Sequence, residues 1–149
     1  MTFIRLIAGR RIIAGGALGA LLLLLASAPA APADRFPFDQ ELLLDAAPMR
    51  PAKRVPILTV APGGEATVDL WCKTVSARVE LSDAGIKIEP GPLPEALPEM
   101  MGDGQCAPAR MQADEDMLAA LAQVTSWRKH GSLLMLIGPT TLKFRASDH

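Results

Sequence analysis

Residues 75–81 of this chain read Val-Ser-Ala-Arg-Val-Glu-Leu, an unbroken alternation of apolar and polar side chains. A period of two places the apolar side chains on one face of an extended segment, which is typical of a half-buried antiparallel strand. We therefore expect a strand whose inward residues are Val75, Ala77, Val79 and Leu81. This segment favours a protein built mainly on an antiparallel sheet.

Short segments of similar character lie on both sides of this strand, separated by turn residues such as Pro62-Gly63-Gly64 and Asp83-Ala84-Gly85. The further expected strands are residues 38–44, 55–60, 66–72, 86–89, 125–129, 133–137 and 141–145, of which the first could instead form a helical turn. Alternation within residues 66–72 places Cys72 on the inward face and Trp71 on the opposite face.

Residues 114–124 (Asp-Glu-Asp-Met-Leu-Ala-Ala-Leu-Ala-Gln-Val) predict the one helix of the chain. Its apolar residues recur at three- and four-residue spacing and form one stripe, namely Met117, Leu118, Leu121 and Val124. Asp114 is interpreted as the N-cap, where a carboxylate also favours the helix dipole. Residues 90–104 hold four prolines and three glycines, and we expect them to lack regular structure over most of their length.

Residues 1–33 have the composition of a secretory signal peptide. Arg5, Arg10 and Arg11 precede a run of apolar residues and glycines over 12–26, and small residues with two A-x-A patterns follow over 27–33. A retained membrane anchor is the alternative, but a membrane span needs about 20 apolar residues. We expect cleavage at one of the two sites, near Ala33, and release to the periplasm or the medium.

Removal of the leader leaves 12 basic and 16 acidic residues, a net charge of −4. This charge argues against nucleic acid or anionic lipid as the main partner, so membrane contact is expected only before cleavage. The remaining 116 of the 149 residues suit a single domain over 34–149, which we expect to be monomeric.

Cys72 and Cys106 are the only cysteines of the chain. In an oxidising compartment an even pair favours a disulfide, which would close a loop of about 35 residues and contribute about 3.8 kcal/mol. Two free thiols, or a metal or redox pair, are the alternatives, although no C-x-x-C spacing is present.

The sequence lacks a catalytic constellation. There is no G-x-S-x-G motif, and the only histidines are His130, in an expected turn, and the final residue His149. The acidic triplet at residues 114–116 is interpreted as a helix cap with dipole partners, with a weak divalent-cation site as the alternative. We therefore expect no enzyme, no catalytic residue, no cofactor and no metal site.

Sulfur-containing side chains gather near the Pro- and Gly-rich loop, at Met100, Met101, Cys106 and Met111. Soft ligands of this kind bind Cu(I), but methionine is also a common filler of protein cores. Trp71 and Trp127 are candidate partner-binding residues, because tryptophan is enriched at binding hot spots, and core packing is the alternative.

The order of these elements resembles the META/HslJ-like domain family. Cys106, the acidic helix at 114–124, the His130-Gly131 turn, the apolar segment at 133–137 and Leu142-Lys143-Phe144 are similar to its second half. In the first half, Trp71-Cys72-Lys73 aligns with the G-C-N element of the family. The glycine and the asparagine of that element are absent, so no role of the asparagine is carried over. The resemblance spans residues 36–146.

The resemblance implies a mostly β (α+β) domain, a small antiparallel barrel-like sheet with one helix packed on it, exported to the bacterial envelope. The family has envelope or stress-related roles and no catalytic residues to transfer. We accordingly expect a non-enzymatic protein that binds an unknown envelope protein or has a structural role there. The alternative is a small-ligand carrier that uses the barrel interior, and the third hypothesis is a Cu(I)-binding protein.

Overall fold

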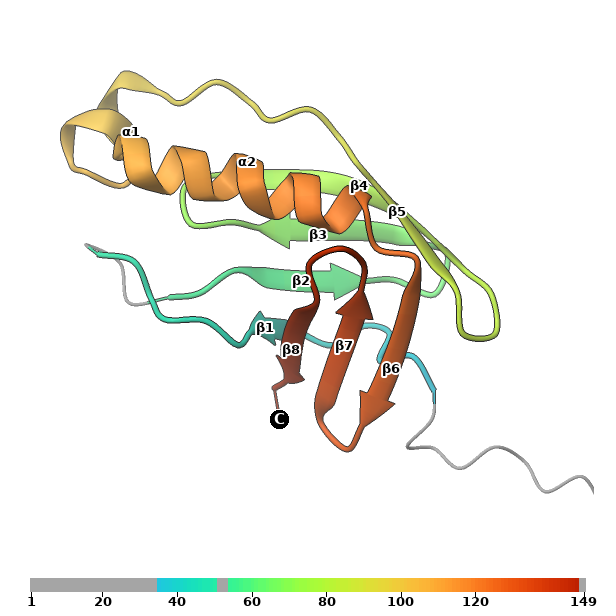
Figure 1. The fold of residues 1–149 in the computed structure, drawn as a ribbon. Helices are drawn as coiled ribbons and strands as arrows, with labels where there is room; N and C mark the ends of the chain where they lie inside the picture. Colours follow the sequence, from blue (N-terminus) through green and yellow to red (C-terminus); the bar gives the residue numbers. More distant parts are fainter. Residues whose placement is uncertain (1–34, 51–53, 148–149) are drawn as a thin grey trace, which may run out of the picture.

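The computed structural model describes residues 35–50 and 54–147 of the chain (Figure 1). These residues contain eight strands and two helices. The strands are β1 (Leu42–Leu44), β2 (Ile57–Val60), β3 (Glu65–Asp69), β4 (Thr74–Leu81), β5 (Ile86–Pro90), β6 (Ser126–His130), β7 (Leu133–Ile137) and β8 (Leu142–Ala146). The helices are α1 (Pro98–Gly102) and α2 (Pro108–Ala122).

The predicted leader, residues 1–33, lies outside the described residues. Within the described residues, no helix combines the length and the apolar character that a membrane span requires.

The strands form one antiparallel sheet in the order β5-β4-β3-β2-β1-β8-β7-β6. Every neighbouring pair is consecutive in the chain except β1 and β8, which pair in the register Leu43↔Arg145. The β1–β8 ladder therefore joins an N-terminal five-stranded half to a C-terminal three-stranded half.

The two outer strands of this order, β5 and β6, approach each other and nearly close the sheet into a barrel. Gly85 and Ser126 form an isolated antiparallel bridge. The N–H of Ile86 donates to the carbonyl of Thr125 at 3.1 Å, and the N–H of Trp127 donates to the carbonyl of Ala84 at 3.0 Å. The expected mostly β, barrel-like architecture is thus confirmed.

The alternation in β4 is what directs side chains to the interior. Val75 and Val79 are buried and Ala77 and Leu81 half-buried, while the intervening polar residues are exposed. The interior holds apolar side chains with no exposed surface, including Leu42, Leu58, Val60, Val68, Leu70, Leu121, Leu134, Leu136 and Phe144. Burial of this apolar area is the main favourable contribution to folding.

Helix α2 runs in nearly the same direction as β3 and β4 in the view of Figure 1, and it packs against β5. Its stripe is confirmed, because Met117, Leu118 and Leu121 are buried. Its expected start is wrong, since the helix begins at Pro108, where the fixed φ of proline suits the first turn. Asp114 is therefore not an N-cap but a buried residue in the second turn of the helix.

Two further expectations need correction. The strand expected over 66–72 ends at Asp69, and the chain then turns. The loop at 90–104 contains the short helix α1, so the described residues hold two helices rather than one. Pro98 is at the first position of α1, where it removes no hydrogen bond that the helix needs.

Candidate partner-binding site

The connection between β3 and β4 is a tight turn, Leu70 to Lys73, closed by the register Asp69↔Thr74. The N–H of Leu70 donates to the carbonyl of Lys73 at 2.8 Å. The next three N–H groups, those of Trp71, Cys72 and Lys73, point to α2 instead of to another strand. Backbone N–H groups that face no neighbouring strand need acceptors from elsewhere in the fold.

Asp114 supplies those acceptors. Its Oδ1 accepts from Trp71 N at 2.9 Å, its Oδ2 accepts from Lys73 N at 3.0 Å, and both oxygens are 3.2 Å from Cys72 N. Successive N–H groups that converge on one carboxylate form charge-assisted hydrogen bonds. Asp114 thus holds the turn against the helix.

Asp114 has no exposed surface, and its burial raises the pKa of the carboxyl group above the ordinary value of 3.8. The hydrogen bonds from Cys72, Lys73 and Trp71 and the charge of Lys73 act in the opposite direction without cancelling this effect. The charged form of this carboxyl group is therefore less stable here than it is in water.

Cys72 and Cys106 lie at disulfide distance, with their Cα atoms 4.9 Å apart and both side chains buried. Cys106 comes two residues before the start of α2. The turn at residues 70–73 is therefore attached to the N-terminal part of the helix at two places, through Asp114 and through the cysteine pair.

Arg110 lies one helical turn before Asp114 and is only 1% exposed. Its Nη2 donates to the carbonyl of Trp71, while Nε and Nη1 have no partner among the described residues. A buried guanidinium is costly to desolvate, and the hydrogen bond to Trp71 offsets only part of that cost. Arg110 and Asp114 together bind the carbonyl and the N–H of Trp71.

A groove of about 360 Å³ lies beside this turn, between α2 and the strands β1 and β8. Its lining residues are Leu44, Trp71, Ala113, Asp116, Met117, Ala120, Thr140 and Leu142. The indole ring of Trp71 is half-buried, and its Nε1 is buried without an acceptor among the described residues. The groove is thus apolar, with one carboxylate, that of Asp116, at an exposed position.

Trp127 lines a different hollow, of about 270 Å³, at the seam between β6 and the β4–β5 turn. Its ring contacts Phe36 edge-on with 5.3 Å between ring centroids, and its Nε1 also has no acceptor among the described residues. The two tryptophans therefore do not form one site. Of the two, Trp71 has the more apolar surroundings, because charged residues line the hollow of Trp127.

The remaining candidates of the sequence are dispersed. His130 is exposed at the end of β6, Glu115 is exposed on α2, and His149 lies outside the described residues. Within residues 35–50 and 54–147, no group of three or more His, Cys, Asp or Glu side chains is placed to hold a metal ion. Cys106, one of the four sulfur residues considered for Cu(I), is at disulfide distance from Cys72.

The family model of the META domain matches residues 40–148, which is most of the chain. The chain belongs to the META domain family. No curated protein and no solved structure matched it. The residues that match the META domain include the turn at residues 70–73, the cysteine pair and the groove.

Reasoning from the sequence missed Arg110 and the actual role of Asp114. A signal was present, because continuing the apolar stripe of α2 from Leu121 and Met117 in steps of three and four residues reaches Asp114 and then Arg110. Charged residues at those positions of the META domain indicate a buried polar contact rather than the start of the helix.

Proposed function

We propose that this META domain is a non-enzymatic protein of the bacterial cell envelope that binds another envelope protein through the groove beside α2. The observation that carries the proposal is the half-buried Trp71 in an open apolar groove beside α2. Tryptophans in such positions are frequent binding hot spots, since they offer a large apolar area to a partner.

Preorganisation supports the same proposal. The backbone of Trp71 is bound on both sides, by Asp114 at its N–H and by Arg110 at its carbonyl. The next residue, Cys72, is within disulfide distance of Cys106. A side chain on a fixed backbone loses less conformational entropy when a partner binds, which leaves more of the contact energy for affinity.

The alternative is a small-ligand carrier. The barrel interior gives it little support, because the inward side chains of the described strands fill that space. The groove itself gives it more support, since about 360 Å³ is within the range of small-molecule sites. Protein binding predicts a partner protein at the groove residues, whereas the carrier predicts a small molecule at the same residues.

Export is part of the proposal. We propose that the leader at residues 1–33 is removed near Ala33 and that the domain is released in the periplasm or outside the cell. An oxidising compartment would allow the Cys72–Cys106 bond to form and persist.

A pair of adjacent positions on α2 allows a matched crosslinking test. Ala120 lines the groove, whereas Ala119 is exposed and is not part of its lining. A photoreactive phenylalanine analogue placed at either position is activated in intact cells. We expect a discrete crosslinked protein from position 120, lost on Trp71→Ala, and none from position 119. Equal patterns from both positions, or no adduct from either, would contradict protein binding at the groove.

The carrier alternative is tested by native mass spectrometry of the protein purified from the envelope. A bound small molecule that is present in the wild type and absent in Trp71→Ala would favour the carrier. If the wild type and Trp71→Ala both have the mass of the unliganded protein, and the adduct forms at position 120, protein binding is favoured.

A further inference from the structure

Two large apolar side chains stand out on the described surface, Leu97 and Met101, at 59% and 51% exposure. Leu97 is the N-cap of α1 and Met101 is its fourth residue. The N–H of Met101 donates to the carbonyl of Leu97 at 3.3 Å, so the two residues bound the same helical turn. Helix α1 itself has no buried residue. We name residues 95–103 the α1 knob.

The knob is held in place by contacts on its C-terminal side. The N–H of Cys106 donates to the carbonyl of Met100 at 2.7 Å, and Cys106 is at disulfide distance from Cys72. The N–H of Gln105 donates to Oδ1 of Asp103 at 2.8 Å. A five-residue helix that buries nothing is unstable by itself, so these attachments keep it formed on the surface.

The charge of this segment has one sign. Residues 91–107 contain Glu95, Glu99 and Asp103 and no Lys, Arg or His. All three acids are exposed, and none of them forms an ion pair with another described residue. The next basic residue along the chain, Arg110, is buried and bound to Trp71.

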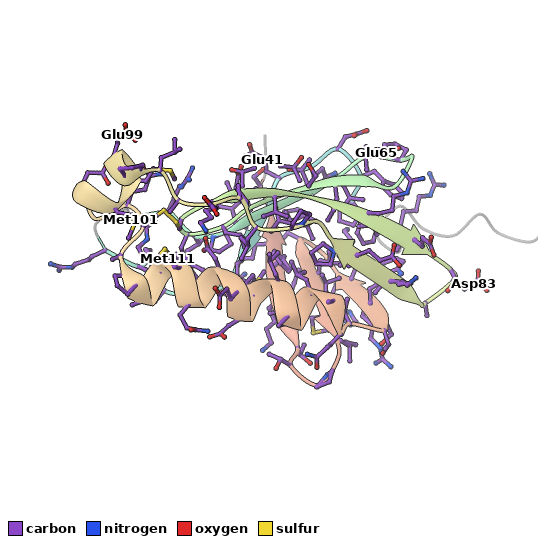
Figure 2. All side chains as sticks on the ribbon, turned by 90° about the horizontal axis from the view of Figure 1, so that it is seen from above. Glu41, Glu65, Asp83, Glu99, Met101 and Met111 are labelled. Carbon is purple, nitrogen blue, oxygen red and sulfur yellow. A yellow bond between two sulfur atoms is a disulfide. The ribbon has the colours of Figure 1, made fainter. Side chains whose placement is uncertain are left out.

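Figure 2 places Glu99 on the outer side of α1, at the end of the molecule where Met101 and Met111 also lie. The surface there combines exposed apolar side chains with exposed acids that form no ion pair among the described residues. Methionine side chains are flexible and adapt to differently shaped apolar partners.

We propose that the α1 knob is a docking surface for a basic amphipathic segment of a partner protein. Apolar side chains of that segment would cover Leu97 and Met101, and its Lys or Arg residues would pair with Glu95 and Glu99. Segments of this kind bind apolar surfaces that carry acidic residues at their edges, where opposite charge sets both orientation and association rate.

Charge also selects this occupant over the others. A second copy of the chain docked face to face would bring the same three acids together, which costs free energy. An anionic membrane surface would be repelled for the same reason. The knob is distinct from the groove at Trp71, so the proposal does not depend on the function proposed above.

The test uses the protein purified after export and two synthetic peptides that form amphipathic helices. One peptide consists of leucine and lysine, and the other has glutamate at every lysine position. We expect calorimetric titration to show binding of the lysine peptide only, weakened by added salt because the ion pairs are exposed. The double variants L97S/M101S and E95Q/E99Q should each weaken binding about tenfold.

Two control variants lie outside the knob. Glu115→Gln removes an exposed carboxylate outside the knob and should leave the affinity unchanged. Trp71→Ala alters the groove and should leave it unchanged as well, and a loss there would move the binding site to the groove and overturn the proposal. Far-ultraviolet circular dichroism checks that each variant is folded.

Three further results would overturn the proposal. Equal affinity for the glutamate peptide would show an unselective apolar patch. Full affinity in both double variants would show that the knob is not the site. A dimer in light scattering that disappears in L97S/M101S would assign the patch to self-association instead.

Discussion

The carboxylate of Asp114 accepts the backbone N–H of Cys72 in the β3–β4 turn, across 42 residues of sequence. The same side chain binds the N–H groups of Trp71 and Lys73. One buried acid on α2 therefore satisfies three consecutive donors of a turn that has no strand neighbour for them. This contact positions Trp71 at the wall of the groove.

Removing that acid should destabilise the domain strongly. Asp114→Ala leaves the buried N–H of Cys72 and the part-buried N–H groups of Trp71 and Lys73 without acceptors, and each unsatisfied buried group costs about 1–3 kcal/mol. We expect a loss of about 3 kcal/mol or more in the free energy of unfolding, measured by urea denaturation. Glu115→Ala, one residue along the helix at an exposed position, should change it by less than about 0.5 kcal/mol. Similar losses of unfolding free energy in both variants would contradict the argument that the hydrogen bonds of Asp114 stabilise the turn.

The pH dependence of stability follows from the raised pKa of Asp114. The folded state binds this proton more tightly than the unfolded chain, whose pKa is near 3.8. The resulting stabilisation is complete below the unfolded pKa and is lost as the pH rises through the folded pKa. The stability of the wild type minus that of the non-titrating Asp114→Asn variant should therefore decrease from pH 3 upward. An increase with pH would show that the three N–H groups outweigh desolvation and lower the pKa.

The strands were predictable because their pattern is local. In β4 and β8, every second residue faces the interior, and this period can be read without any knowledge of the neighbouring strands. The start of α2 was not predictable in the same way. Arg110 and Asp114 have surface-type side chains, and their burial is compensated by a turn some 40 residues earlier.

The candidate site was predictable only in part. Trp71 and the cysteine pair were identified from residue type and number, but the groove combines side chains from β1, β8, α2 and two connections. The periodicity of one segment does not predict which side chains of distant segments meet in a groove. Trp127 lies elsewhere because β6 is the last strand of the sheet order, whereas Trp71 follows β3.

Gly64 should be sensitive to the smallest side chain. It has a φ of +89°, and a Cβ built there would collide with the carbonyl oxygen of Val79. Gly64→Ala should lower the free energy of unfolding by more than about 1 kcal/mol. Gly102→Ala is the matched control, because no atom lies near its Cβ position and α1 tolerates alanine. Thermal unfolding of both variants compares them, and an equal melting temperature for Gly64→Ala and wild type would contradict the steric argument.

Intact-mass measurement of the exported protein checks the proposed leader. Cleavage near Ala33 removes Arg5, Arg10 and Arg11 with the apolar run and leaves a chain that begins near Asp34. We expect one mass without lipid, and which of the two A-x-A sites is used follows from its value. A full-length mass in the membrane fraction would instead show that the segment is kept as an anchor.

The bond between Cys72 and Cys106 should be present in the exported protein and should stabilise it. Without reduction, an alkylating reagent applied to the unfolded protein should label neither cysteine, and after reduction it should label both. The C72A/C106A variant should lose about 3–4 kcal/mol of unfolding free energy, because the unfolded chain is then free of a loop of about 35 residues. The same variant should also bind the lysine peptide more weakly, since the α1 knob loses its attachment to the β3–β4 turn. Labelling of both cysteines before reduction would show that the pair is reduced in the envelope, and the stability attributed to the bond would then have to come from packing alone.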